Sequence, residues 1–212
     1  MQKEKIENMI GKIYCEDCLE TMKRMPDKSI DLVLTDPPYG IGDKFKGGKN
    51  SKMNKFNSIV AKGWDVVPAE EIFDEIFRIS KYQIIWGGNY FKLPPTRGFI
   101  IWDKKVSEDF TLAMAEYAWT SFDTLAKIYR LATEKDNRLH PTQKPLDLMT
   151  FCLNFALQRD NTIKTIYDPF SGSGTTLVCA KSKGLNYIGS ELDKDYYEII
   201  QKRLQTVQGS LF

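Results

Sequence analysis

Histidine and cysteine are both scarce in this chain of 212 residues. The single histidine is His140, and the four cysteines stand at positions 15, 18, 152 and 179. Cys15 and Cys18 form a C-x2-C pair, but no second pair follows at the spacing of a zinc ribbon. The sequence therefore predicts no metal site, and it predicts thiols that stay reduced, some of them in the core.

Long apolar runs and a strong net charge are absent as well. No run approaches the length of a membrane span, and the first residues, MQKEKIENMI, lack the pattern of a signal peptide, so we expect a cytoplasmic protein and no membrane partner. A net charge of +2 gives no general signature of nucleic-acid binding. The charge is uneven, however, because residues 43–62 carry six lysines against one acid, with glycines and asparagines between them. Residues 41–63 are therefore predicted to form a mobile, lysine-rich loop.

Strand and helix signals alternate along the chain. Strands are expected at 12–15, 30–35, 83–86, 98–102, 115–122, 125–131, 165–167 and 186–189, and helices at 18–25, 68–80, 146–158, 174–182 and 194–205. This order predicts an α/β fold, with a mostly parallel sheet covered by helices on both faces. No repeat or low-complexity linker interrupts it, so residues 1–212 are predicted to form one domain.

The stretch LVLTDPPYG, residues 32–40, combines features that a plain turn does not need. A buried strand ends in a carboxylate, Asp36, followed by two prolines and the aromatic ring of Tyr39. Proline fixes the backbone, so the two prolines hold the carboxylate and the ring in place at the end of the strand. The pattern indicates a site rather than a connection.

A second informative stretch, TIYDPFSGSGTTLVCAKSKGLNYIGSELD, begins at Thr165. A strand ends at Asp168, a glycine-rich turn follows, and a helix is expected to begin near Gly174. Small residues there let backbone N–H groups approach a ligand closely. The next strand ends beside Glu191, where an acid can accept both hydroxyls of a ribose. The segment thus predicts a nucleoside-binding half of an α/β fold.

The chemistry of this turn favours a nucleoside without phosphates. The turn lacks the lysine of a phosphate-binding loop, which disfavours ATP or GTP hydrolysis. The dinucleotide fingerprint needs a third glycine where Leu177 stands, so NAD comes second. Asp168 would repel a pyrophosphate and would favour an amino group or a sulfonium. These features favour S-adenosylmethionine as the cofactor.

Taken together, TDPPYG and DPFSGSGTT resemble the motifs of the N6/N4 amino-methyltransferases of DNA. The order resembles the permuted, β-type group, in which the Asp-Pro-Pro-Tyr half precedes the cofactor half. HPTQKPLDLM, residues 140–149, and ELDKDYYEIIQKRL, residues 191–204, resemble further segments of the same family, so that the resemblance covers nearly the whole chain. It implies a Rossmann-like, S-adenosylmethionine-dependent methyltransferase fold.

The resemblance also implies roles for individual residues. The catalytic turn would comprise Asp36, Pro37, Pro38 and Tyr39. At the cofactor's adenine would lie Asp17 and Cys18, at its ribose Glu191, and near its methionyl carboxylate Lys144. Toward its methionine end would lie Asp36, Asp168, Phe170, Ser171, Gly172, Ser173 and Gly174, with Thr175 and Thr176 at the start of the helix. The composition and position of the lysine-rich loop, rather than the resemblance, predict the contacts with nucleic acid, at Lys44, Lys46, Lys49, Lys52 and Lys55.

The implied reaction is methyl transfer to the exocyclic N6 amine of adenine in DNA. The lone pair of that amine is delocalised into the ring. Asp36 and the carbonyl of Pro37 are therefore expected to accept hydrogen bonds from its two N–H groups, which frees the lone pair to attack the methyl group. Tyr39 would stack on a base swung out of the helix. Trp86 and the glycines after it are candidates for the wall of the base pocket.

Several alternatives stay open. Cytosine-C5 methylation needs a cysteine nucleophile after proline, and no Pro-Cys occurs here. Cytosine-N4 methylation usually has serine in place of Asp36, so the acid favours adenine. RNA as the substrate, or a non-catalytic nucleic-acid-binding subunit, would keep the same fold. Residues 123–139 leave no room for a separate target-recognition domain. The enzyme would therefore have relaxed specificity, read a short site through the lysine-rich loop, or need a partner; a homodimer and a role in restriction-modification stay open.

Overall fold

The computed structural model describes residues 3–41, 65–106, 113–132 and 143–207. In chain order the elements are η1 (Ile6–Asn8), β1 (Ile13–Tyr14), α1 (Cys18–Arg24), β2 (Ile30–Thr35), α3 (Glu70–Ile79), β3 (Ser80–Trp86), η3 (Gly88–Tyr90), β4 (Phe99–Asp103), β5 (Ala115–Thr120), β6 (Lys127–Arg130), α4 (Leu146–Leu157), β7 (Thr165–Asp168), α5 (Thr175–Ser182), β8 (Asn186–Ser190) and α6 (Lys194–Thr206). None of the helices in these ranges is both long and apolar enough to cross a membrane.

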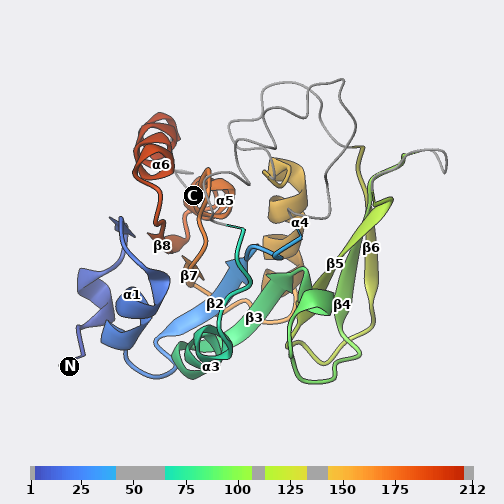
Figure 1. The fold of residues 1–212 in the computed structure, drawn as a ribbon, viewed down its shortest axis with the longest axis horizontal. Helices are drawn as coiled ribbons and strands as arrows, with labels where there is room; N and C mark the ends of the chain where they lie inside the picture. The colour runs from blue at the N-terminus through green and yellow to red at the C-terminus, as the bar shows by residue number, and fades with distance from the viewer. Residues whose placement is uncertain (1–2, 42–64, 107–112, 133–142, 208–212) are drawn as a thin grey trace.

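The strands of the described residues form one eight-stranded sheet in the order β1-β8-β7-β2-β3-β5-β4-β6 (Figure 1). Along this order, β1, β8, β7 and β2 each pair in parallel with the next strand, as far as β3. Strand β5 runs against both of its neighbours, β3 and β4, while β6 is parallel to β4. The expected mostly parallel sheet is thus confirmed, and the reversal occurs at β5.

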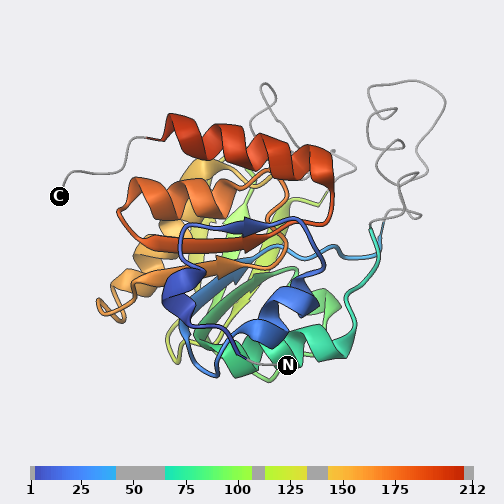
Figure 2. The same ribbon diagram turned by 90° about the vertical axis from the view of Figure 1, so that its left-hand side faces the viewer.

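Two helical layers cover the sheet (Figure 2). On one face α1 and α3 pack on side chains such as Val33 and Ile85. On the other face α4 and α5 cover Leu32, Leu34 and Ile84. Successive side chains of a strand point to opposite faces, so the apolar run of β2 serves both layers.

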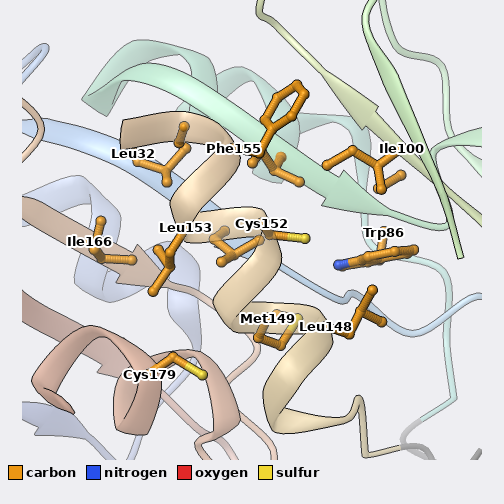
Figure 3. Packing of buried hydrophobic residues seen from close by; sticks show 14 of the residues in the cluster. Leu32, Trp86, Ile100, Leu148, Met149, Cys152, Leu153, Phe155, Ile166 and Cys179 are labelled. Atoms are coloured by element: carbon orange, nitrogen blue, oxygen red, sulfur yellow. The ribbon is translucent and has the colours of Figure 1, made fainter. Parts of the chain in front are cut away.

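The core beneath α4 is dense and almost wholly apolar. Figure 3 shows Leu148 and Cys152 of this helix on its side toward Trp86, and Met149 nearer to Cys179 of α5. Trp86 is fully buried at the last position of β3. This packing fixes the carboxyl ends of β2 and β3, which carry the candidate site.

The element boundaries differ from expectation in small ways. Strand β3 begins at Ser80 rather than at residue 83, because it continues directly from the end of α3 without a loop. Strand β5 ends at Thr120 rather than at residue 122. The start of α1 is set by Asp17, whose Oδ1 accepts a hydrogen bond of 2.8 Å from the backbone N–H of Leu19.

Candidate functional site

The candidate site lies where the strand order of the sheet changes direction. The chain passes from β2 to β3 on one side and from β7 to β8 on the other, while β2 and β7 are themselves neighbours. Parallel α/β sheets bind ligands in the crevice at the carboxyl ends of such strands. Asp36 follows β2 and Asp168 ends β7 at this point. The hydroxyl of Thr35 joins the two strand ends by donating to Asp168 Oδ1 at 2.8 Å.

The Asp-Pro-Pro-Tyr turn folds back so that its ring touches its own carboxylate. The hydroxyl of Tyr39 donates to Asp36 Oδ1 at 2.5 Å. The other carboxylate oxygen, Oδ2, accepts from Lys144 Nζ at 2.6 Å. Pro37 is buried. The carboxylate therefore has a fixed orientation and a partner on each oxygen.

The residues after β3 form a seat for the Tyr39 ring. Gly87 has a left-handed φ of 68°, and a Cβ there would lie 2.1 Å from Cε1 of Tyr39. Tyr90 stacks on the same ring, with centroids 4.8 Å apart and planes inclined by 16°. Because Tyr90 is 46% exposed, it forms the outer surface of this aromatic stack. A base cannot enter between the two rings unless Tyr90 moves.

A line of alternating charges runs from Asp36 toward the reversed strand. Lys144, immediately before α4, lies with Nζ 2.6 Å from Asp36 Oδ2 and 3.0 Å from Glu116 Oε2. Glu116, on β5, also pairs through Oε1 with Lys104 Nζ at 2.6 Å. The side chain of Lys144 is only 6% exposed. We call Asp36, Lys144, Glu116 and Lys104 the charge row.

Three members of the charge row, Asp36, Lys144 and Glu116, have shifted pKa values. Burial raises the pKa of Asp36, and the Glu116 carboxylate adds to this while Lys144 opposes it. Burial alone would lower the pKa of Lys144, but Asp36 and Glu116 together raise it well above its ordinary value. Burial would likewise raise the pKa of Glu116, but Lys144 and Lys104 lower it to about 2. Lys144 is therefore an ammonium and Glu116 a carboxylate at neutral pH.

The glycine-rich turn connects β7 to α5 and faces the end of β8. Gly172 has a φ of 52°, and no described heavy atom other than its chain neighbours would meet a Cβ there within 4 Å. Its backbone N–H donates to Glu191 Oε2 at 2.7 Å, and the N–H of Asp193 donates to Oε1 at 2.9 Å. Gly174, with a φ of 79°, precedes the first residue of α5. The turn thus leaves open space beside an acid that backbone groups hold in place.

Asp168 and Glu191, at the carboxyl ends of β7 and β8, both have raised pKa values. Burial raises the pKa of Asp168 to about 6, although hydrogen bonds from Thr35, Thr176 and the N–H of Phe170 oppose it. Burial also raises the pKa of Glu191 to about 7, against the two backbone N–H groups that it accepts. Cationic or hydrogen-bond-donating groups of a ligand would stabilise these carboxylates, whereas phosphates would destabilise them.

The start of α1 lies at the same edge of the sheet. The N–H of Glu191 donates to the carbonyl of Tyr14 at 2.9 Å, which ties the end of β1 to the end of β8. Asp17 and Cys18 follow shortly after β1. Burial, followed by the charge of Asp17, raises the pKa of Cys18 to about 12, so its thiol stays neutral.

The structure thus gathers the predicted residues of the two motifs at the carboxyl ends of the parallel strands. Lys144, predicted to lie near a cofactor carboxylate, contacts Asp36, Tyr39 and Glu116, and its role toward the cofactor stays a prediction. Glu116 and Lys104 were not expected, since nothing in their local sequence distinguishes them from surface charges at strand ends. The five candidate nucleic-acid contacts lie outside the described residues, namely Lys44, Lys46, Lys49, Lys52 and Lys55.

The candidate site is therefore suited to two tasks. The turn around Gly172 and the acid Glu191 can hold a nucleoside with free hydroxyls and a cationic group. The carboxylate of Asp36, on the neighbouring strand, can accept N–H bonds from a second ligand placed over Tyr39.

Known proteins share both the sequence pattern and the fold. The N6_N4_Mtase family, described as DNA methylase, matches residues 67–202, more than half of the chain. The chain is also 26% identical over 266 residues to the Type II methyltransferase M.HinfI of Haemophilus influenzae, in an alignment that covers 98% of this chain and 72% of that protein.

Two solved structures illustrate the likeness in three dimensions. The PvuII DNA methyltransferase, named as cytosine-N4-specific, superposes with a TM-score of 0.62 at 16% identity, over 100% of this chain and 89% of its own. TTHA0409 of Thermus thermophilus, complexed with S-adenosyl-L-methionine, superposes with a TM-score of 0.52 at 20% identity, over 91% of this chain and 93% of its own. At these identities the likeness concerns the fold, and it confirms the expected Rossmann-like class.

Proposed function

The chain belongs to the N6/N4 family of DNA methylases, and we propose that it transfers the methyl group of S-adenosylmethionine to the N6 amine of adenine in DNA. The observation that carries the proposal is the fixed carboxylate of Asp36, held at the switch point of the sheet beside the glycine-rich turn. Neither oxygen can turn freely, so the group is organised before the substrate arrives.

The residues at the turn fit this cofactor. Glu191 is held by two backbone N–H groups, and its oxygens are suited to the two ribose hydroxyls. Asp168 is buried and close enough to Asp36 for its pKa to be raised by that charge, which favours the cationic methionine end. When bound, the cofactor supplies a methyl group on a cationic sulfur, and its C–S bond breaks as the amine forms the new N–C bond. Asp17 and Cys18 would border its adenine.

Asp36 is the residue on which the chemistry depends. As an ionised carboxylate it accepts an N–H of the target amine, which withdraws the amine from conjugation and exposes its lone pair. The amine loses one proton once it is methylated, and Asp36 is placed to receive it and relay it to water. Lys144 favours the ionised carboxylate, because its ammonium opposes the rise in pKa that burial causes.

The aromatic pair Tyr39 and Tyr90 would receive the base. Extruded bases are held by stacking between aromatic or apolar side chains, at about 1–3 kcal/mol per base. Tyr90 is the exposed member of the stack, so its displacement would open the face of Tyr39. The lysine-rich residues 43–62, which follow this turn in the sequence, would then contact the phosphates.

The choice of adenine over cytosine rests on Asp36 itself. The resemblance gives serine at this position to cytosine-N4 enzymes, and an acid to adenine enzymes. A carboxylate is also the stronger acceptor, which suits the weakly nucleophilic amine of adenine. The choice of DNA over RNA follows the family, whose description names DNA.

The test is to incubate the protein with methyl-labelled S-adenosylmethionine and either DNA or RNA, and to identify the modified nucleoside after digestion. We expect N6-methyldeoxyadenosine. N4-methylcytosine, or label in RNA alone, would refute the assignment of base or polymer. Cofactor binding without any product would indicate a non-catalytic subunit.

The matching variants are Asp36→Asn and Asp27→Asn. Asp36→Asn should lower turnover by roughly a hundredfold or more, the usual loss for a preorganised polar group, while calorimetry shows cofactor binding retained. Asp27 pairs with Arg78 near the amino-terminal ends of β2 and β3, away from the candidate site, so its variant should keep full turnover. A tenth or more of wild-type turnover in Asp36→Asn would remove Asp36 from this role.

A further inference from the structure

One ammonium group in the charge row serves two carboxylates. Lys144 Nζ lies 2.6 Å from Asp36 Oδ2 and 3.0 Å from Glu116 Oε2, and the hydroxyl of Tyr39 is 3.3 Å away. The side chain of Lys144 is 6% exposed, so water cannot readily replace a partner that it loses. A buried charge that loses its partner is strongly destabilising. The position of Lys144 therefore depends on both acids together.

Each oxygen of Asp36 already accepts one hydrogen bond, so the incoming amine must share an oxygen with Tyr39 or Lys144. Tyr39 occupies Oδ1 and Lys144 occupies Oδ2. The contact from Tyr39 lies within the rigid Asp-Pro-Pro-Tyr turn, whereas Lys144 is held on a long, flexible side chain from another segment. Lys144 is thus the partner that can give way. It can do so only if another buried acceptor retains its charge.

Glu116 is placed to be that acceptor. It lies on β5, the reversed strand, paired in register with Trp102 of β4, and its own side chain is 21% exposed. Lys104, at the end of β4, holds its second oxygen at 2.6 Å and so fixes the carboxylate from behind. Two acids and two lysines sum to no net charge, so a shift of Lys144 along the charge row leaves the total unchanged.

We propose that Glu116 is a positioning residue for methyl transfer, which takes over the ammonium of Lys144 when the target amine binds to Asp36. The proposal rests on the proposed function, because it presupposes that Asp36 accepts an amine. Lys104 acts one step further out, by holding Glu116 in place. Lys144 thereby favours the ionised form of Asp36 in the free enzyme and releases it to the substrate.

The coupling can be measured without any turnover. Among the described residues, the ionisable groups that face Asp36 are Tyr39 on its own turn, Lys144 before α4, Glu116 on β5 and Asp168 on β7. Carbon-13 NMR of the aspartate carboxyls, with Asp36→Asn to assign the signal, gives the titration midpoint of Asp36. Glu116→Gln removes a negative charge and should move that midpoint down. Lys104→Met removes a positive charge and should move it up.

Opposite shifts from these two variants are the signature of the charge row. Glu75→Gln is the matched control. Glu75 has a similarly buried side chain, 19% exposed, and pairs with Arg78 on α3, away from the charge row. It should leave the midpoint unchanged. A merely structural role of Glu116 would not shift the midpoint of Asp36 in a direction set by charge. Unmoved midpoints in both variants would overturn the proposal.

Turnover tests the second half of the proposal. In Glu116→Gln, Asp36 is the only carboxylate left to Lys144, so the amine must compete with it. The kcat should therefore fall about tenfold or more, which is the scale of losing one charged partner. The KM for the cofactor should stay as in wild type, and Glu116→Asp should recover part of kcat. Full turnover in Glu116→Gln would show that Lys144 needs no second partner, and the proposal would be wrong.

The two proposals fail in different ways. A wild-type protein that methylates neither DNA nor RNA refutes the proposed function directly. The proposal for Glu116 fails by itself if wild type methylates DNA and Glu116→Gln matches it. Should Glu116→Gln not fold, as judged by thermal unfolding, Lys104→Met and Glu116→Asp keep the test. Lys104→Met must then raise the midpoint and lower kcat, while Glu116→Asp leaves the midpoint near that of wild type.

Discussion

Replacing Gly87 by alanine should distort the Asp-Pro-Pro-Tyr turn through Tyr39. The new Cβ would lie 2.1 Å from Cε1 and 2.6 Å from both Cδ1 and Cζ of the Tyr39 ring. Such distances are far below van der Waals contact, so the ring must move by roughly 1 Å or more, because packed interiors offer little free space. The hydroxyl of Tyr39 would then lose its 2.5 Å bond to Asp36 Oδ1.

The cost has two parts that a matched variant can separate. Gly87 has a φ of 68°, and a left-handed conformation costs a non-glycine residue about 1–2 kcal/mol. The lost hydrogen bond to a charged acceptor adds about 1.5–3 kcal/mol. Gly184 has nearly the same φ, 69°, but no described atom would meet its Cβ within 4 Å. Gly184→Ala should therefore show only the cost of the left-handed backbone. In both variants, alanine lowers the conformational entropy of the unfolded chain, which offsets about 0.4–1 kcal/mol of that cost.

The assay is urea denaturation of both variants, followed by methylation kinetics. Gly87→Ala should be less stable than Gly184→Ala by about 1.5–3 kcal/mol, the size of the hydrogen bond. Only Gly87→Ala should lose turnover. In a Tyr39→Phe background, where that bond is already absent, the extra cost of Gly87→Ala should shrink, as expected for coupled neighbours. Equal stability of the two alanine variants, together with full turnover, would refute the link between Gly87, Tyr39 and Asp36.

Four further outcomes follow from the described contacts and the sequence. Glu191→Gln should weaken cofactor binding by about 1–3 kcal/mol in calorimetry, the cost of stranding buried donors; unchanged affinity would remove Glu191 from the ribose. Asp17→Ala should lower the free energy of unfolding by about 1 kcal/mol in urea, because α1 loses its cap. The pKa of Asp168 is raised to about 6 and that of Glu191 to about 7. The stability that these groups give the cofactor-free protein is therefore complete below their ordinary pKa values and is lost as the pH rises through 6 and 7. Thermal unfolding across that range should show this loss, with a smaller slope in Glu191→Gln. Replacing four lysines of the lysine-rich loop by alanine should flatten the salt dependence of DNA binding by about one unit of slope per lost phosphate contact, and an unchanged slope would place the DNA elsewhere. The four are Lys46, Lys49, Lys52 and Lys55.

Local sequence signals predicted the elements closely, because each has clear punctuation. The prolines after Thr35 end β2, the glycines after Trp86 end β3, and the acid at position 193 caps α6 through the N–H of Asp195. The two motifs also implied that their carboxylates lie at one sheet edge, since parallel strands end on the same side. Asp36 and Asp168 do so, joined through the hydroxyl of Thr35.

The charge row could not be predicted in the same way. Its members come from the end of β2, the start of α4, and strands β5 and β4, and their meeting depends on the reversed direction of β5. No periodicity in residues 115–120 distinguishes a reversed strand from a parallel one. A lone acid at the start of a strand, such as Glu116, also looks like an ordinary surface charge. The motif around Lys144 predicted a functional role for it, but its partners depend on the packing.

The electrostatics of the site connect its stability with its choice of ligand. Asp36, Asp168 and Glu191 all have raised pKa values, chiefly because they are buried, and the charges of neighbouring acids add to this. Of these three acids, Lys144 pairs only with Asp36. A pyrophosphate would add negative charge beside them, whereas a sulfonium and an ammonium group would add positive charge. The burial that weakens the cofactor-free protein as the pH rises therefore favours a cationic, phosphate-free nucleoside, which stabilises the ionised carboxylates.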